Sequence, residues 1–507
     1  MSRRALRNAR LALLAGLALR APLAVAADEK PPAPLHEDAR VVPVPWTLPQ
    51  AGACVPPRGA PGAPPDADAS GAPFQTGDTF GLAQLDVLRD YLPPFLWEQR
   101  ERFFFEGMRL EIGRCFADYG PPEFYREASA RYAGEPRLSD AGGLEEYSAG
   151  QPFPPDRIAP DDPQAGLRWA WNVELRYQGA GFAGRFRTSD MVGRDGRAEP
   201  FVGEIFKHQV AFRSDRPGYQ APGADEKHWV AGGVLEEPFD ARHHAWRQYR
   251  DIEHLENPGR SDDLHVYLPD HRRVRRIPAS DIEGLYMPSF SVGVMKPQVL
   301  AGVTGGADGG SGAGALAAAG AAGSITTKRS GFEGLELRPL LYTWKVQGVQ
   351  DLLTPIDAKT PGFPAAENRD FGPWGLSFAS DRWDLRRALV LEARTQGGAG
   401  GDAVDRMLLY VDLQTLVPLY YASWDSRGEA IDAGMYVGRW SEDRDAYPRW
   451  PDDAQRPVRA IDTVGASFAH IAQGGGWRRE SWEIVSTPPP DAELRRLLSV
   501  KELTKRR

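Results

Sequence analysis

Short segments rich in β-branched and aromatic residues recur along most of this chain, and clusters of Gly, Pro, Asp or Asn separate them. This pattern is typical of strands joined by turns. The segments read LRWAWNVELRY, KHWVAGGVL, DLHVYLP, RRALVLEAR, RMLLYVDL, LVPLYYASWD, AGMYVGRW and ESWEIV. They predict a mainly β (α+β) fold built on one large antiparallel sheet, and the 54 Gly and 44 Pro among 507 residues agree with many turns.

Two neighbouring segments are apolar on both alternating faces. In the first segment the two faces carry Met407, Leu409 and Val411 against Leu408 and Tyr410. In the second segment they carry Leu419 and Tyr421 against Tyr420 and Trp424. Strands of this kind are covered on both sides. Either helices cover one face while the other curves around an apolar cavity, or the strands form the core of a closed sandwich or barrel.

The first 26 residues have the features of a signal peptide. A basic stretch with Arg3, Arg4 and Arg7 precedes the short apolar run LALLAGLAL, and Ala24-Val25-Ala26 fits a small-residue cleavage site. The apolar run is shorter than the roughly 18 to 20 residues that span a bilayer. We expect cleavage near Ala26 and a periplasmic mature protein, either free or associated with the outer membrane.

The sequence holds two cysteines, Cys54 and Cys115. An oxidising compartment favours a structural disulfide between them. Closing a loop of this size stabilises a fold by roughly 3 to 4 kcal/mol in the chain-entropy model.

Composition divides the rest of the chain. Residues 27–75 form a Pro/Ala/Gly-rich segment without apolar periodicity, which predicts an irregular arm. The main domain is expected over 76–487, and Leu residues at helical spacing in GLAQLDVLRDYL predict a helix near its start. A low-complexity Gly/Ala stretch at 302–324 predicts a flexible insertion, and 488–507 predicts a polar C-terminal tail with a short helix.

Motifs for cofactor, metal or nucleophile chemistry are weak. The stretch from Gly312 to Ala317 fits a relaxed dinucleotide fingerprint but lacks the strand and helix that would frame it. His243, His244 and His254 form no HExxH pair and are interpreted as strand-surface residues. No Gly-x-Ser-x-Gly elbow is present. We therefore expect no cofactor, no metal site and no catalysis.

Four arginines, at 272, 273, 275 and 276, surround one valine in LHVYLPDHRRVRRIP. The alternation before Pro269 and the turn residues after it predict a β-hairpin. Both faces of the return strand then carry charge, which places it near a sheet edge. The net charge of −8 argues against nucleic acid. We interpret Arg273 and Arg275 as a rim contact for an anion or an acidic partner.

Four stretches occur in one order from about residue 121 to 440: PPEFYREASARYAGEPRLSDAGGLEEYSAGQPFP, DDPQAGLRWAWN, VYLPDHRRVRRIP and DRMLLYVDLQTLVPLYYASWDSRGE. With them the chain resembles a domain-of-unknown-function family of exported Gram-negative proteins grouped with the outer-membrane lipoprotein carriers LolA and LolB. The most specific parts are the Ala149-Gly150-x-Pro152-Phe153-Pro154 run, the Asp162-Pro163-x-Ala165-Gly166 run with Trp171-Asn172, and the arginine cluster.

The resemblance implies a LolA-like fold, in which a strongly curved, incomplete β-barrel encloses space for acyl chains or another apolar ligand. It also implies carriers rather than enzymes, associated with inner-membrane permeases or outer-membrane proteins. We therefore expect a periplasmic carrier of a lipid-like hydrophobic molecule. The alternative is a sensor or envelope assembly protein that binds a protein partner through the same fold. Candidate cavity-lining residues are Trp169, Trp171, Leu409, Tyr421 and Trp424.

Overall fold

The computed structural model describes residues 48–54, 72–159, 161–191, 200–269, 272–278, 284–286, 336–359, 379–396, 404–443, 449–450, 456–471 and 476–505. All of them belong to the unit Leu35–Arg507, and each statement below refers to these ranges. The expected signal peptide, most of the expected arm and the insertion at 302–324 lie outside the described residues.

One 15-stranded sheet organises the described chain. Its strands are β1 (Thr79–Phe80), β2 (Leu110–Cys115), β5 (Gln178–Met191), β6 (Phe201–Gln209), β7 (Lys227–Glu237), β8 (Ala245–Asp251), β9 (Asp263–Leu268), β10 (Arg273–Pro278), β11 (Tyr342–Thr354), β12 (Arg382–Thr395), β13 (Arg406–Asp412), β14 (Pro418–Trp424), β15 (Ala430–Trp440), β16 (Ile461–His470) and β17 (Gly476–Val485). A separate two-stranded ribbon joins β3 (Arg137–Leu138) to β4 (Leu144–Glu145).

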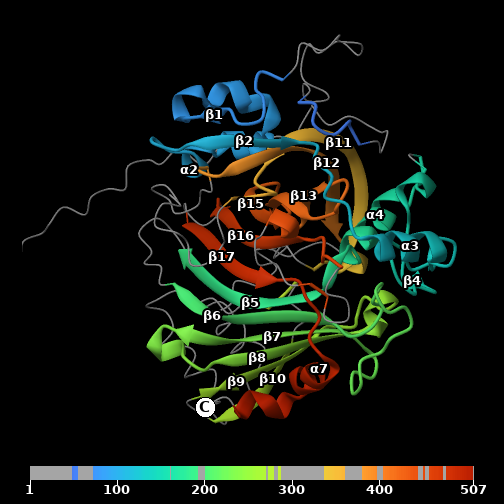
Figure 1. Ribbon diagram of the computed structural model, residues 1–507. Helices are drawn as coiled ribbons and strands as arrows, with labels where there is room; N and C mark the ends of the chain where they lie inside the picture. Colours follow the sequence, from blue (N-terminus) through green and yellow to red (C-terminus); the bar gives the residue numbers. More distant parts are fainter. Residues whose placement is uncertain are drawn as a thin grey trace, which may run out of the picture. The chain divides into compact units, whose positions relative to one another are not determined.

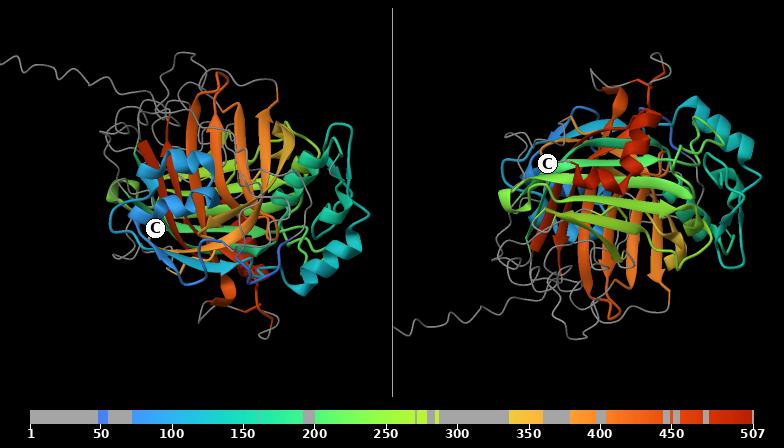
Figure 2. Two further views of the ribbon diagram at one scale, coloured as in Figure 1. Left: turned by 90° about the horizontal axis from the view of Figure 1, so that it is seen from above. Right: turned by 90° about the horizontal axis from the view of Figure 1, so that it is seen from below.

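The strand path runs β1-β2-β12-β13-β14-β15-β16-β17-β5-β6-β7-β8-β9-β10, with β11 also paired to β12. The pair β2–β12 is parallel, and the other described pairs are antiparallel. Within the described residues β1 and β10 end the path and do not pair with each other, so the sheet is open. Figures 1 and 2 show it curving strongly along this path, which confirms the predicted mainly β fold with an incomplete barrel.

The helices are short and few. They are α1 (Pro94–Glu98), α2 (Arg100–Phe103), α3 (Glu123–Tyr132), α4 (Ala165–Glu174) and α7 (Asp491–Leu498), with the 3₁₀ helices η1 (Leu82–Tyr91), η2 (Pro155–Arg157), η3 (Phe239–Ala241), η4 (Ile252–Leu255), η6 (Pro339–Leu341), η7 (Ser441–Asp443) and η8 (Val500–Thr504). In the described ranges no helix has the length and apolar character needed to cross a membrane.

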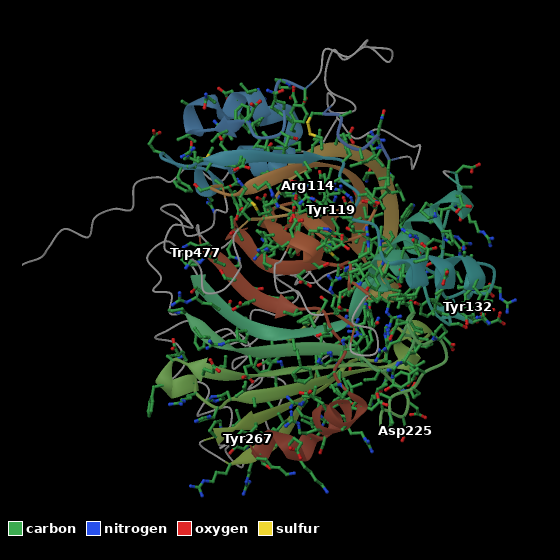
Figure 3. All side chains as sticks on the ribbon, in the orientation of Figure 1. Arg114, Tyr119, Tyr132, Asp225, Tyr267 and Trp477 are labelled. Atoms are coloured by element: carbon green, nitrogen blue, oxygen red, sulfur yellow. A yellow bond between two sulfur atoms is a disulfide. The ribbon has the colours of Figure 1, made fainter. Side chains whose placement is uncertain are left out.

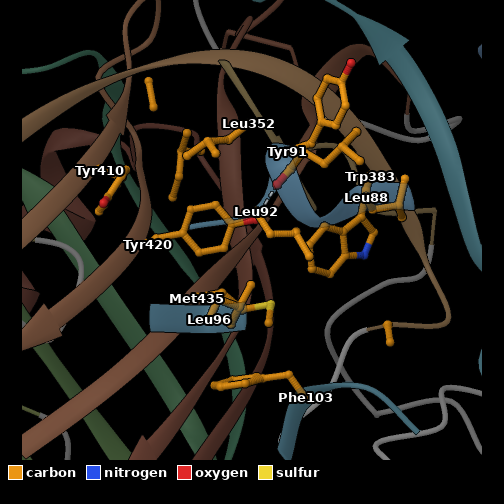
Figure 4. Packing of buried hydrophobic residues seen from close by; sticks show 14 of the residues in the cluster. Leu88, Tyr91, Leu92, Leu96, Phe103, Leu352, Trp383, Tyr410, Tyr420 and Met435 are labelled. Atoms are coloured by element: carbon orange, nitrogen blue, oxygen red, sulfur yellow. Dashed lines mark hydrogen bonds between the residues drawn. The ribbon is translucent and has the colours of Figure 1, made fainter. Parts of the chain in front are cut away.

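Apolar clusters cover both faces of β12–β14, as their two-sided pattern predicts. One cluster places Leu88 and Leu96 of the N-terminal helical segment with Tyr410 and Tyr420 of the sheet (Figure 4). Leu408 belongs to the same cluster. The second cluster places Trp169 of α4 on the opposite face. Helical segments therefore pack on both sides of these strands.

The alternation of β14 is interrupted. Tyr410 pairs with Tyr420 but Val411 pairs with Pro418, so a bulge lies at Leu419. Leu419 consequently packs in the same cluster as Tyr420, and the prediction that it shares a face with Tyr421 is wrong. An extra residue on one strand shifts the side-chain alternation beyond it.

The segment LRWAWNVELRY is helical rather than extended. Residues Ala165–Glu174 form α4, and Trp169, Trp171 and Val173 are all fully buried. A helix that is buried on nearly every side loses its amphipathic period. The remaining Trp-Ala-Trp alternation is the same as that of a strand, so the segment was predicted to be extended.

The predicted N-terminal helix exists as the 3₁₀ helix η1, with Leu85, Leu88 and Tyr91 buried at a spacing of three residues. Side chains at i and i+3 eclipse in a 3₁₀ helix, so this spacing makes a narrow apolar row.

The C-terminal segment packs on the sheet, which its polar composition did not predict. Leu494 and Leu497 of α7 are buried in an apolar cluster. Arg247 Nε and Tyr249 Oη of β8 donate hydrogen bonds to the carbonyl oxygens of Leu497 (3.0 Å) and Leu498 (2.8 Å). Two leucines on one face are enough to pack a short helix on the sheet while its other residues stay in water.

Candidate functional site

A pocket of about 440 Å³ lies between α3 and loops at the ends of β13 and β16. Its lining is Tyr119, Pro121, Tyr125, Arg126, Ser129, Ala130, Ala133, Gln151, Pro154, Asp156, Arg157, Tyr177, Gln414, Thr415, Leu416, Val417, Arg459, Ala460 and Ile461. This volume lies within the range of roughly 300 to 1,000 Å³ that small-molecule sites occupy.

The lining of this pocket is amphipathic and cationic. Tyr177, Leu416 and Ile461 are among the aromatic and aliphatic side chains that form its walls. Its charged residues are Arg126, Asp156, Arg157 and Arg459. Three guanidinium groups against one carboxylate favour a ligand with both apolar surface and negative charge.

Backbone contacts hold two of these arginines in place. Arg157 Nη1 donates to the carbonyl oxygen of Ala133 at 2.9 Å, and Arg459 Nε donates to that of Gly120 at 3.3 Å. A guanidinium has five N–H donors in a rigid fork. Arg459 also pairs with Glu442 through Nη1 at 3.7 Å. Each guanidinium keeps further N–H donors that it can present to an anion.

The family motifs build the frame of this pocket. Asn172 of α4 accepts a hydrogen bond from the Phe153 backbone N–H at 2.9 Å and donates one to the Phe153 carbonyl at 2.6 Å. The side chain of Asn172 thus ties the Pro152-Phe153-Pro154 run to the helix.

Gly150 and Gly166 allow two close backbone approaches in the same frame. Gly150 has φ +79°, and a Cβ there would lie 2.5 Å from the Ser129 backbone nitrogen. At Gly166 a Cβ would lie 2.4 Å from the carbonyl oxygen of Trp344 in β11. A side chain at either position would push α3 or α4 away from its neighbour.

Tyr125 of α3 lines the pocket and also contacts the interior of the protein. Its hydroxyl donates to the carbonyl oxygen of Leu175 at 3.3 Å, one residue beyond α4. Burial raises the pKa of Tyr125 well above its usual value, so it stays protonated and donates this bond.

A second polar group lies beside the pocket at Tyr119, and Figure 3 shows Tyr119 next to Arg114. The Tyr119 hydroxyl contacts Asp384 Oδ2 and lies 3.2 Å from Asp357 Oδ2. Burial, with a contribution from Asp357, raises the pKa of Asp384 to about 6. Arg114 and Arg382 pair with Asp357 at 2.7 and 2.6 Å. These ion pairs join β2, β12 and the segment after β11.

Buried charges fill the interior between α4 and strands β6–β8. Arg250 Nη1 lies 2.8 Å from Glu174 Oε1, and Arg250 Nε lies 3.0 Å from Asp262 Oδ1. Lys207 pairs with Glu336. Burial lowers the pKa of Lys207 and raises that of Glu336. Although burial alone would raise it, Arg250 holds the pKa of Glu174 below its ordinary value.

Two histidines join this interior group. His228 and His254 are 2% and 6% exposed, and with Glu174 each offers one possible metal-ligand atom within 4.8 Å of the others. The interpretation of His254 as a strand-surface residue is wrong, because η4 turns it inward beneath α4. Burial lowers the pKa of both rings, which keeps them neutral.

The five predicted lining residues lie in packed clusters. Four of them, Trp169, Trp171, Leu409 and Tyr421, share the cluster beneath α4, and Trp424 lies in the cluster on the other face of the sheet. None is among the residues that line the pocket. Strand periodicity selects buried positions but does not separate a packed core from a cavity wall. The pocket residues come from loops, where only the family motifs gave a signal.

The arginine cluster lies on a hairpin, as predicted. β10 pairs antiparallel with β9, from Arg273 opposite Leu268 to Arg276 opposite His265. Arg273 and Arg275 are exposed, and β10 ends the described strand path. They are far from the pocket residues along this path, so the pocket and the hairpin are separate features.

Cys54 and Cys115 form a disulfide that ties the segment 48–54 to the end of β2. It appears as the yellow bond in Figure 3. The Gly52 backbone N–H also donates to the Cys115 carbonyl at 2.8 Å.

Within the described residues the fold is an open, curved, mainly β sheet with short helices. The chain belongs to the family described as a protein of unknown function (DUF1329), which it matches over residues 84–287 and 319–445. Among curated proteins none matches the sequence.

Three solved structures are among those to which this chain is similar. A DUF1329 family protein from Desulfovibrio piger has 12% identity and a TM-score of 0.35, covering 64% of this chain and 93% of its own. A putative outer membrane lipoprotein-sorting protein domain from Vibrio parahaemolyticus has 12% identity and a TM-score of 0.35, covering 67% and 100%. A LolA superfamily protein from Nitrosomonas europaea has 11% identity and a TM-score of 0.28, covering 65% and 96%.

Proposed function

We propose that the protein is a periplasmic carrier that binds a lipid-like amphiphile with an anionic group in the pocket of about 440 Å³. The single observation that carries this proposal is the lining itself, in which aromatic and aliphatic walls meet Arg126, Arg157 and Arg459. Burying apolar ligand surface contributes about 25 cal/mol per Å². Arginine forks add charge-assisted hydrogen bonds to a carboxylate or phosphate.

The disulfide supports an exported protein. Bonds such as Cys54–Cys115 persist in oxidising compartments and are rare in the cytosol. Together with the signal-peptide pattern of residues 1–26, it favours the periplasm. The carrier acts by binding, without catalysis, and hands its cargo to a membrane permease or an outer-membrane protein.

The alternative function, binding of a protein partner, attaches to a different surface. β10 is an edge strand of the described sheet, and Arg273 and Arg275 project from it into solvent. An edge strand presents backbone groups that a second chain can pair with. This candidate requires the hairpin and leaves the pocket unused.

Competition with a fluorescent fatty acid tests the carrier proposal. Oleate and oleyl alcohol, which share a chain but differ in charge, are titrated against the probe bound to the full mature chain. We expect oleate to bind more tightly, and Arg157→Gln and Arg459→Gln each to weaken oleate by about 10-fold while oleyl alcohol changes little. Arg137→Gln is the matched control, because Arg137 is 63% exposed and pairs with Glu146 away from the pocket.

Two results would overturn the proposal. The first is a full chain that binds neither compound, with no hydrophobic molecule found by mass spectrometry of protein purified from its native periplasm. The second is binding that Arg137→Gln weakens as much as Arg157→Gln and Arg459→Gln do, because the pocket arginines would then have no special part.

A further inference from the structure

We propose that Glu174, His228 and His254 form a binding site for one transition-metal ion, with Zn²⁺ as the expected occupant. The three residues come from the last turn of α4, from β7 and from η4. Each offers a ligand atom, and these atoms lie within 4.8 Å of one another. The site is separate from the pocket and does not depend on its function.

The ring of His254 is oriented as a metal-binding imidazole would be. Its Nδ1 lies 2.7 Å from the carbonyl oxygen of Asp251, so Nδ1 carries the proton and donates it there. The lone pair is then on Nε2, which faces Glu174 Oε1 at 3.8 Å. Metal-ligating histidines commonly donate their other N–H to a backbone carbonyl in this way.

Two hydrogen-bond acceptors thus face each other in the interior with no donor between them. A separation of 3.8 Å is too long for a hydrogen bond. Two ligand atoms each about 2.1 Å from a tetrahedral Zn²⁺ stand roughly 3.4 Å apart, so a small approach of the two side chains would let one ion bridge them. The gap between Nε2 and Oε1 therefore suits a cation.

His228 supplies the independent observation. It is 2% exposed, and neither ring nitrogen has a hydrogen-bond partner among the described residues. Its ring stacks on that of His254, with centroids 5.1 Å apart and planes 11° apart. A buried imidazole without any partner is costly, and metal coordination would satisfy it.

The surrounding charges leave Glu174 available to an ion. Arg250 contacts Glu174 Oε1 at 2.8 Å but also binds Asp262 through Nε at 3.0 Å, so Glu174 is not its only counter-charge. Each carboxylate oxygen has two lone pairs, and Oε1 can therefore contact both Arg250 and a metal. Lys207 is a further nearby cation, and Glu336 pairs with it.

The ligand set selects the kind of ion. Two imidazoles and one carboxylate suit Zn²⁺, Co²⁺, Ni²⁺ or Cu²⁺, whereas Mg²⁺ and Ca²⁺ require mostly oxygen ligands. Burial of all three residues makes this a structural ion that fastens the end of α4 to β7 and η4. The next residue, Leu175, accepts the hydrogen bond of Tyr125, so the ion would also steady one wall of the pocket.

Metal titration of the full mature chain, first stripped with a chelator, tests this site. We expect one Co²⁺ per chain with the visible absorption of tetrahedral cobalt, displacement by one Zn²⁺, and a higher melting temperature with Zn²⁺. His228→Gln and His254→Gln should each lower the affinity for Co²⁺ at least about 100-fold. His208→Gln is the matched control, because His208 is also 2% exposed but lies outside the group.

Wild-type protein that takes up no stoichiometric Co²⁺ or Zn²⁺ overturns the site without recourse to any variant. Retained Co²⁺ binding in folded His228→Gln or His254→Gln, judged by circular dichroism, also overturns it. If either variant unfolds, the stoichiometry of Co²⁺ on the wild-type chain and its tetrahedral absorption decide the question. Loss of oleate binding alone does not bear on this inference.

Discussion

Two parts of the same sheet are buried in different ways. Strands β13 and β14 are almost wholly apolar between their ends, and closely packed clusters cover both faces. Strands β6–β8 are just as buried, but they carry Lys207, His228 and Arg250 into the interior, where Glu174 meets them. The part around β13 and β14 is therefore buried by apolar packing without directional contacts. Burial of the part around β6–β8 depends on specific charge pairs.

This difference changes what each part contributes. Apolar packing stabilises in proportion to the area removed from water. A buried ion pair gains little over an apolar pair of the same shape, but it is costly to break from one side. We therefore expect the charged part to contribute little net stability. We expect it instead to fix a defined geometry or to hold a bound ion.

The largest expected effect is that of removing one buried charge. Arg250→Met leaves Glu174 and Asp262 without their shared partner, and we expect the free energy of unfolding to fall by about 3 to 5 kcal/mol. Chemical denaturation measures it. Arg185→Met is the matched control, because Arg185 and Glu236 are an exposed pair, at 51% and 36%, worth about 0 to 1 kcal/mol. Equal effects of the two changes would remove the contrast between the two parts.

Truncations in the apolar part should cost nearly as much, and on both faces. Leu408 and Leu409 are adjacent in β13, 4% and 0% exposed, and belong to opposite clusters. We expect Leu408→Ala and Leu409→Ala each to lower the free energy of unfolding by about 2 to 5 kcal/mol. If Leu409→Ala costs less than about 1 kcal/mol, Leu409 borders open space, as its prediction as a lining residue requires.

A smaller effect is expected from pH. The pKa of Asp384 rises from 3.8 to about 6 in the folded protein. Between these values the folded state binds the proton more tightly than the unfolded chain, so this group's contribution to stability falls as pH rises through the window, by about 3 kcal/mol at most. Denaturation curves should therefore show that Asp384→Asn, compared with wild type, is more stable at pH 7 relative to pH 4.

Asp118 provides the control of opposite sign. The backbone N–H of Gly120 lowers its pKa, so it stabilises the fold at higher pH and loses this effect as pH falls. Asp118→Asn should therefore change the pH dependence in the direction opposite to Asp384→Asn. The same direction of change for both variants would contradict the assigned pKa shifts.

The apolar part of the fold is the part that the sequence predicts well. The two-sided pattern of β13 predicts cover on both faces, and the turn at Pro269 predicts the β9–β10 hairpin. Strand β5 was missed because Gly, Ser and Thr interrupt its apolar residues. Helix α4 was misread because its burial on nearly every side hides the helical period.

The candidate sites are less accessible to sequence reasoning. Arg157 and Arg459 lie about three hundred residues apart, and only the folded loops bring them to one pocket. Glu174, His228 and His254 come from a helix, a strand and a 3₁₀ turn, so no short motif spacing connects them. Pairing of β16 with β17 and of β17 with β5 links the strands that follow Arg459 and Arg157, and periodicity within a strand says nothing about this long-range pairing.

The smallest expected effect on stability, and the sharpest on binding, concerns the edge of the charged part. Arg273 and Arg275 are exposed on β10, so Arg273→Gln with Arg275→Gln should change the free energy of unfolding by less than about 0.5 kcal/mol. If the hairpin contacts anionic headgroups, the double variant should sediment less with phosphatidylglycerol vesicles than wild type, and added salt should narrow the difference. Neutral phosphatidylcholine vesicles are the control. If sedimentation is unchanged, these arginines are strand-end residues whose charge keeps them in water. Charged residues of this kind are an ordinary way in which an edge strand avoids pairing with another chain.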